Sequence, residues 1–123
     1  MKVNSQLFHR YTPRPMPDTP PAQSQPLAAA LARMWDRFLP EINARIAILE
    51  EAAAANPLSQ EQRAAAHAAA HKLAGSLGMF GLQRGTEVAR QAELALAEDP
   101  VTATSAELTE WVAELHALIL NRS

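Results

Sequence analysis

The chain contains no cysteine, which excludes disulfide bonds, thiolate zinc sites and a cysteine nucleophile. β-Branched residues are also scarce, because Val, Ile and Thr together number 14 whereas alanine alone numbers 26 among 123 residues. Alanine is the best helix former, and β-branched residues are typical of strands. The composition therefore favours an all-α fold of closely packed helices, in a single domain because the chain is too short for two cores.

The sequence also lacks a large excess of charge and any long apolar run. A formal net charge of −2 gives no field that would attract nucleic acid or an anionic membrane, so we expect neither as a partner. No run of about 18 apolar residues is present, and the first residues lack the apolar core of a signal peptide. We therefore expect a soluble, cytoplasmic protein.

Proline is distributed unevenly along the chain. Six of the nine prolines lie between positions 13 and 26, with Thr, Ser and Gln between them. This composition predicts an extended, flexible arm over residues 1–26 that forms no part of a core. We expect residues 27–123 to form the folded domain.

From residue 27 onward the apolar spacing is helical throughout. Proline and glycine, together with two capping-box patterns, divide this region into five predicted helices. The first runs from Leu27 to a break at Pro40, the second to Asn56–Pro57, the third from Ser59 to about residue 80, the fourth from a turn at Gly81 to Asp99–Pro100, and the fifth from Thr104 onward. Short links between amphipathic helices predict an up-and-down four-helix bundle with an additional short N-terminal helix.

The third predicted helix has an unusual face around His71. Leu73 and Leu77 lie on its core side, whereas the side that carries His71 has few long side chains at about 100° per residue. We call this surface the His71 face; its other members are Ala64, His67, Ala68, Ala74, Gly75 and Gly78. Glycine within a helix costs about 0.5–1 kcal/mol relative to alanine, so the two glycines predict a partner that approaches the backbone closely.

His71 is a candidate nucleophile on this face. Neutral imidazole has a free nitrogen near pH 7 and attacks electrophiles well. Between residues 63 and 90, four basic residues accompany a single acid, Glu87, in an otherwise acidic domain; the four are Arg63, Lys72, Arg84 and Arg90. A local positive field of this kind favours a transferred phosphoryl group.

Residues 71–82, His-Lys-Leu-Ala-Gly-Ser-Leu-Gly-Met-Phe-Gly-Leu, resemble the signature of histidine-containing phosphotransfer (HPt) domains. In this resemblance His71 is the phosphorylated histidine, Leu73 the buried residue after it, and Gly75 the glycine one turn on. Ser76 matches the small residue and Gly81 the turn glycine. The five predicted helices over residues 27–122 also fit the family's plan.

The resemblance implies a phosphoryl carrier of two-component phosphorelays. It implies that His71 accepts a phosphoryl group from a phospho-aspartate on one receiver domain and passes it to another, without autonomous kinase activity. The implied partners are response-regulator receiver domains and a sensor histidine kinase, including hybrid kinases. No cofactor is expected on this chain, Mg²⁺ is expected to arrive with the receiver, and we expect a monomer.

One position departs from the family pattern. The basic residue usually found three positions after the histidine is Ala74 here. We expect Lys72 to replace its contact with the phosphate, with Arg90 as the second choice. The departure also leaves open slower transfer, or an adapter that docks a receiver or kinase without being phosphorylated.

Glu93 is predicted to orient His71. His71 precedes the Gly81 turn by ten residues and Glu93 follows it by twelve, which places them about 15 and 18 Å from the turn. A carboxylate at that level can accept a hydrogen bond from Nδ1 and leave Nε2 free to attack. HPt domains carry a Glu or Gln at about this position; the alternative is a solvated surface glutamate.

Other groups are predicted to have structural roles. His67 and His71 have metal-ligand spacing, but their neighbours supply no third ligand, so we expect no metal site. His9 and His116 have no supporting neighbours. Four aromatic residues are predicted to pack in the core: Trp35, Phe38, Phe80 and Trp111. Without a glycine-rich nucleotide loop, we expect no ATP binding.

Overall fold

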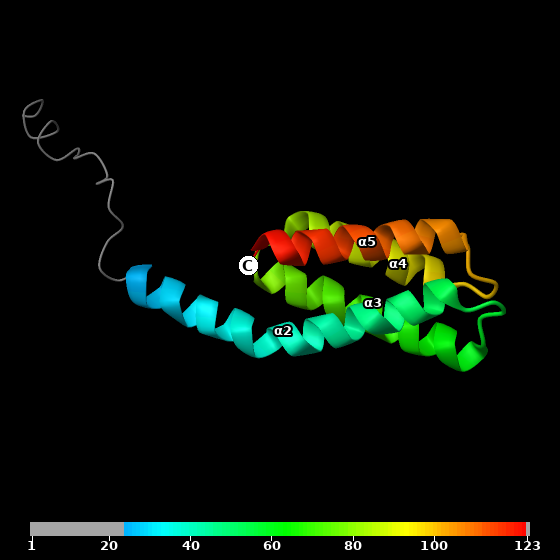
Figure 1. The fold of residues 1–123 in the computed structure, drawn as a ribbon, viewed down its shortest axis with the longest axis horizontal. Coiled ribbons are helices and arrows are strands. Elements are labelled where there is room, and N and C mark those ends of the chain that lie inside the picture. The colour runs from blue at the N-terminus through cyan, green and yellow to red at the C-terminus, as the bar shows by residue number, and fades with distance from the viewer. Residues whose placement is uncertain (1–23, 123) are drawn as a thin grey trace, which may run out of the picture. The chain divides into compact units, whose positions relative to one another are not determined.

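The structure is a computed structural model that describes residues 24–122 (Figure 1). This part of the chain contains four helices and no strand, which confirms the all-α fold class. The helices are α2 (Ser24–Ala54), α3 (Gln60–Met79), α4 (Gln83–Ala97) and α5 (Ser105–Arg122). The chain divides after Arg33 into two compact units, and the hydrophobic core lies within the second.

Most of the predicted N-terminal arm lies outside the described residues. Its last three residues, 24–26, belong to the first turn of α2, so this helix begins slightly earlier than the sequence predicted. Proline is tolerated in a first turn because the missing N–H has no partner within the helix there. Pro26 therefore marks a helix start rather than the end of an extended segment.

The predicted break at Pro40 is wrong, because α2 continues through this residue and no separate short helix precedes it. A proline inside a helix removes one hydrogen bond and crowds the preceding turn, at a cost of about 3 kcal/mol. Buried side chains nevertheless continue at helical spacing on both sides of it, namely Trp35, Ile42, Ile46 and Leu49. Packing of this continuous apolar face offsets the cost, and Pro40 itself is exposed.

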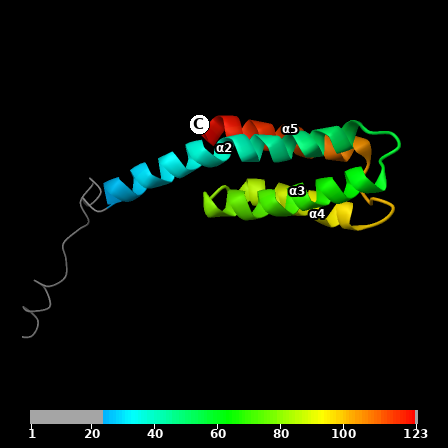
Figure 2. The same ribbon diagram turned by 90° about the horizontal axis from the view of Figure 1, so that it is seen from below.

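Within residues 34–122 the helices run alternately up and down in a bundle (Figures 1 and 2). All four contribute buried residues to one core, to which α3 and α4 supply many small side chains. Phe80 joins this core through edge-to-face contacts, with ring centroids 5.2 Å from Trp35 and 6.0 Å from Phe38. Trp111 also packs against the core, which agrees with the packing role predicted for the aromatic residues.

Both predicted capping boxes are present. The Gln62 backbone N–H donates to Ser59 Oγ and the Ser59 N–H donates to Gln62 Oε1, each at 3.0 Å. Thr104 and Glu107 exchange the equivalent bonds at the start of α5, at 2.9 and 3.0 Å. These bonds satisfy N–H groups that have no partner inside the helix.

The turn between α3 and α4 is built around Gly81, whose φ of +75° favours glycine. It brings α3 and α4 together as an antiparallel hairpin, which is the pair that positions His71.

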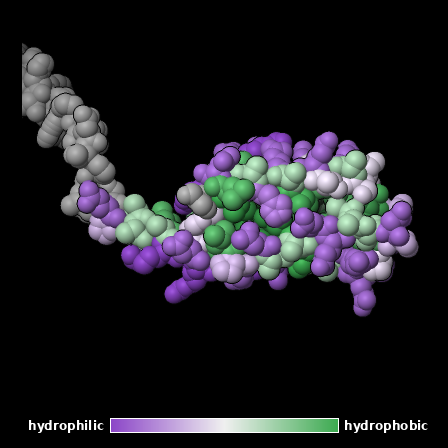
Figure 3. All heavy atoms as spheres, viewed as in Figure 1, coloured by the Kyte–Doolittle hydropathy of each residue, from purple (hydrophilic) through white to green (hydrophobic). Residues whose placement is uncertain are grey.

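None of the helices in residues 24–122 combines the length and the apolar character needed to cross a membrane. On the face drawn in Figure 3, hydrophobic surface shows between hydrophilic side chains.

Candidate functional site

His71 lies in the middle of α3 and points away from the bundle. Ala70, Leu73 and Leu77 bury the opposite side of the helix, and this packing fixes which side faces out. The His71 side chain is 67% exposed. A rigid element therefore presents the imidazole to solvent at a fixed place.

Glu93 of α4 meets the ring. Its Oε2 lies 2.7 Å from His71 Nδ1, and its side chain is only 18% exposed. A carboxylate can only accept hydrogen bonds, so it favours the tautomer with the proton on Nδ1. Nε2 then carries the free lone pair, and no residue among 24–122 makes a hydrogen bond to it.

Most of the His71 face is open, as predicted. Ala64, Ala68, Gly75 and Gly78 are exposed, and His67 is partly exposed. A Cβ atom built on Gly75 would meet no other atom within 4 Å. Nothing in the described structure therefore requires glycine at position 75 for packing.

The placement of Ala74 on this face is wrong, because this residue is 2% exposed and belongs to the core. It lies about 60° around the helix from His71, on the side that faces α4. Thr86 of α4 packs there and donates from its hydroxyl to the Ala74 carbonyl at 3.3 Å. The small side chain thus permits close contact between α3 and α4.

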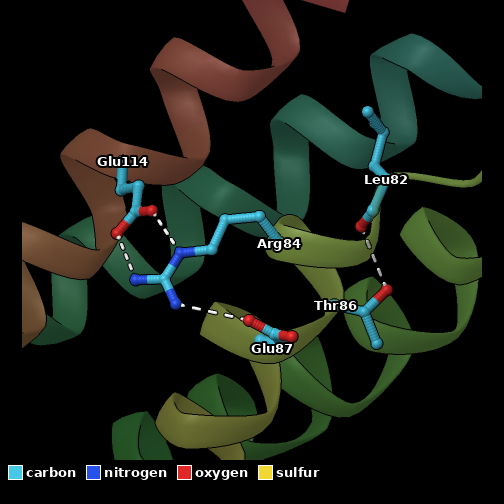
Figure 4. A network of polar contacts seen from close by, with 5 residues as sticks. All are labelled: Leu82, Arg84, Thr86, Glu87 and Glu114. Carbon is cyan, nitrogen blue, oxygen red and sulfur yellow. Dashed lines mark hydrogen bonds and ion pairs between the residues drawn. The ribbon is translucent and has the colours of Figure 1, made fainter.

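Two of the four basic residues behind the predicted positive field, Arg63 and Arg84, have partners elsewhere in the fold. Arg84 is held by Glu114 through bonds of 2.5 and 3.0 Å and lies 3.4 Å from Glu87 (Figure 4). The hydrogen bonds to Glu114 raise the pKa of Arg84, and Arg84 lowers the pKa of the Glu114 carboxyl. Arg63 donates to the Leu96 carbonyl at 2.8 Å and so caps the end of α4.

The same close view shows a side-chain hydrogen bond in the first turn of α4, next to this network. The Thr86 hydroxyl lies 3.3 Å from the carbonyl oxygen of Leu82, one turn earlier (Figure 4). The Thr86 hydroxyl therefore lies within hydrogen-bond distance of two carbonyl oxygens, that of Leu82 and that of Ala74 in α3. The bond to Ala74 links the helix that carries His71 to the helix that carries Glu93.

Lys72 and Arg90 are the two predicted basic residues that remain near His71. Lys72 is exposed and forms no ion pair with any residue from 24 to 122. Arg90 places Nη1 3.9 Å from Glu93 Oε1, so its charge acts first on the carboxylate. Lys72 is thus the more available of the two cations.

Sequence reasoning missed Arg45. This residue of α2 lines a hollow next to His71, together with Glu41, Lys72 and Gly75. A sequence signal existed in the opposite charges at positions 41 and 45, which are neighbours on one helix face. The register between α2 and α3 was needed to place that pair beside the histidine.

Metal-ligating residues do not cluster in the described part of the chain. No group of three or more His, Asp or Glu side chains there is arranged to hold a metal ion. His116 lies on α5, with Nε2 4.0 Å from Glu50 Oε1. His9 lies outside the described residues.

Comparison with known proteins adds a family match over most of the chain. A model described as the Hpt domain matches residues 33–120. Protein RcaC of Microchaete diplosiphon is 36% identical over 83 residues, which cover 65% of this chain and 13% of that protein. The chain thus corresponds to a small part of this relative's length. No solved structure gives a significant match.

Proposed function

This chain belongs to the Hpt domain family, and we propose that it is a phosphoryl carrier whose phosphorylated residue is His71. The contact of 2.7 Å between His71 Nδ1 and Glu93 Oε2 supports this assignment most directly. It leaves Nε2 as the exposed nucleophilic atom on an otherwise open helix face. A histidine without such a partner would divide its proton between both nitrogens.

In the proposed step, the Nε2 lone pair attacks the phosphorus of an aspartyl phosphate on a receiver domain. The N–P bond forms as the P–O bond to the aspartate breaks, and the electron pair of that bond leaves with the aspartate carboxylate. The Nδ1 proton stays on the ring, which becomes a phosphorylated imidazolium. Attack by an aspartate of a second receiver reverses these changes and restores neutral His71.

Glu93 stabilises the charge that this step creates. The imidazole gains a positive charge on transfer, and the carboxylate already lies at hydrogen-bond distance from its N–H. Hydrogen bonds that involve charged groups are worth about 1.5–3 kcal/mol, roughly twice the value for neutral pairs. Glu93 therefore orients the ring before transfer and favours the phosphorylated state after it.

Lys72 offsets negative charge on the phosphoryl oxygens, and Arg90 acts as the second cation. Arg90 also steadies Glu93, because its guanidinium lies 3.9 Å from that carboxylate. In this proposal the receiver supplies the remaining catalytic chemistry, and a Mg²⁺ ion bound there would neutralise charge on the transferred group. In this proposal the chain itself has no kinase activity and depends on receiver domains and a sensor histidine kinase.

The exposed members of the His71 face form the docking surface for these partners. They are Ala64, His67, Ala68, Gly75 and Gly78. Short side chains here let the receiver's phospho-aspartate reach Nε2 without displacing protein atoms. Gly75 is the clearest case, because its surroundings are open.

The alternative role, an adapter that docks a receiver or kinase without being phosphorylated, depends on Ala74 standing where the family usually has a basic residue. Close packing against Thr86 accounts for that residue without reference to phosphate chemistry. No other observation favours the adapter. The experiment below separates the two roles.

The test is to mix the chain with receiver domains carrying radiolabelled aspartyl phosphate and to measure protein-bound label. Wild type and His116→Gln should acquire alkali-stable, acid-labile label, whereas His71→Gln should acquire none. His116 is the matched control because it is an exposed histidine on another helix. Label on His71→Gln at the wild-type level would overturn the proposal, and receiver binding without label on wild type would establish the adapter.

A further inference from the structure

A hollow of about 460 Å³ opens beside His71 between α2 and α3. His71, Lys72 and Gly75 line it from α3, and Glu41 and Arg45 line it from α2. Glu93 belongs to α4, so the contact at Nδ1 turns Nε2 away from that carboxylate, and His71 itself lines the hollow. A partner that reaches Nε2 would therefore also cover the hollow.

Arg45 is the one cation in the hollow that the fold holds in place. Its side chain is 23% exposed, and Nη1 lies 3.4 Å from Ser76 Oγ while Nη2 donates to Glu41 Oε1 at 3.0 Å. A guanidinium has five N–H donors, so three of them are without a partner among residues 24–122. Lys72, by contrast, is a flexible exposed ammonium.

The position of Arg45 decides what it can contact. It is level with Ser76, which lies five residues beyond His71 and thus about 7.5 Å farther along the axis of α3. This offset places Arg45 to one side of the phosphoryl group that Nε2 would carry. A docked partner that covers the hollow can lie across the open surface of Gly75 between the two residues and reach Arg45 with a side chain of its own.

Resting on the proposed phosphotransfer at His71, we infer that Arg45 binds a carboxylate on the partner receiver's docking surface and so determines which receivers the chain accepts. The planar fork of an arginine matches a carboxylate through two parallel N–H donors. Arg45 is already oriented by Ser76, so little side-chain freedom is lost on binding. Glu41 is exposed enough to rotate aside when a receiver carboxylate takes its place on the guanidinium.

The test measures the rate of transfer to wild type, Arg45→Gln, Arg45→Lys and Ser76→Ala from the receiver that labels wild type fastest. Arg45→Gln should lower kcat/KM by about 10- to 100-fold, through KM, while kcat at saturation stays within about twofold. Its KM should also depend less on salt than that of wild type. Arg45→Lys should recover only part of the loss, because an ammonium lacks the fork.

Ser76→Ala shows whether Arg45 acts by binding the receiver or only by linking α2 to α3. It removes the same contact between α2 and α3 but leaves the guanidinium, so its loss should be limited to what the orientation of Arg45 contributes and be much smaller than that of Arg45→Gln. Equal loss in Ser76→Ala and Arg45→Gln would overturn the inference, as would an unchanged KM in Arg45→Gln. If no receiver labels wild type, the proposed function fails and the role of Arg45 fails with it; labelled wild type with an unchanged Arg45→Gln overturns Arg45 alone.

Discussion

Replacing Glu93 tests how much of the reactivity of His71 depends on its neighbour. Glu93→Ala removes a hydrogen bond of 2.7 Å to a ring that becomes cationic on transfer. Such bonds are worth about 1.5–3 kcal/mol, and because His71 is largely exposed we take a value in the lower half of this range, about 2 kcal/mol. At about 1.4 kcal/mol for each factor of ten, the transfer rate should fall by about 30-fold.

Glu93→Gln separates the effect of charge from that of the hydrogen bond, because glutamine retains an oxygen that can accept the bond but carries no charge. Neutral bonds have about half the strength of charge-assisted ones, so transfer should fall by about fivefold. Rapid-quench measurement of labelled His71 gives both rates. Glu110→Ala is the matched control, since this exposed glutamate has no side-chain partner among residues 24–122.

A second measurement reports on the tautomer directly. Long-range ¹H–¹⁵N spectra of the imidazole distinguish a protonated Nδ1 from a protonated Nε2. Wild type should show the Nδ1–H form, and Glu93→Ala should show a mixture of both. Transfer at the wild-type rate by Glu93→Ala would refute the assignment of Glu93, and an unchanged tautomer in that variant would show that another group sets it.

Two further predictions concern docking and stability. Gly75→Gln should weaken receiver binding by about tenfold or more, because its side chain would fill the approach to His71, while the melting temperature stays unchanged or rises slightly. Calorimetric binding and thermal unfolding check this, and tight binding by the folded variant would contradict it. Arg84 lowers the pKa of Glu114 in the folded protein. Their ion pair should therefore stabilise the fold at pH values above the ordinary glutamate pKa. This stabilisation should be lost as the pH falls through the lowered pKa of Glu114, because the carboxylate is then protonated. Thermal unfolding should therefore separate wild type from Arg84→Gln near neutral pH and not at about pH 2; an equal difference at both would contradict the linkage.

Local patterns in the sequence predicted much of the fold correctly. The capping boxes at Ser59 and Thr104 and the turn at Gly81 depend on a few neighbouring residues, and each occurs as expected. The level of Glu93 beside His71 followed from helix rise and the place of the turn. These features need no knowledge of how distant helices pack.

The misplaced features depend on packing between helices. Pro40 has a poor local propensity for a helix interior, but the apolar face on both sides of it outweighs that propensity. Ala74 lies at the edge of the exposed arc, where only the approach of Thr86 decides that it is buried. Arg45 reaches the site from another helix, so its role depended on a register that spacing along one helix does not contain.

The Ser59 capping box and the Gly81 turn secure both ends of α3, and His71 lies far from either end. Helices fray from their ends, so the turn that carries the nucleophile is the part of α3 that opens least. A receiver therefore meets a surface that is already ordered, and little conformational entropy is lost when the complex forms. Productive encounters can then be brief and weak, which suits a protein that must release one partner before it serves the next.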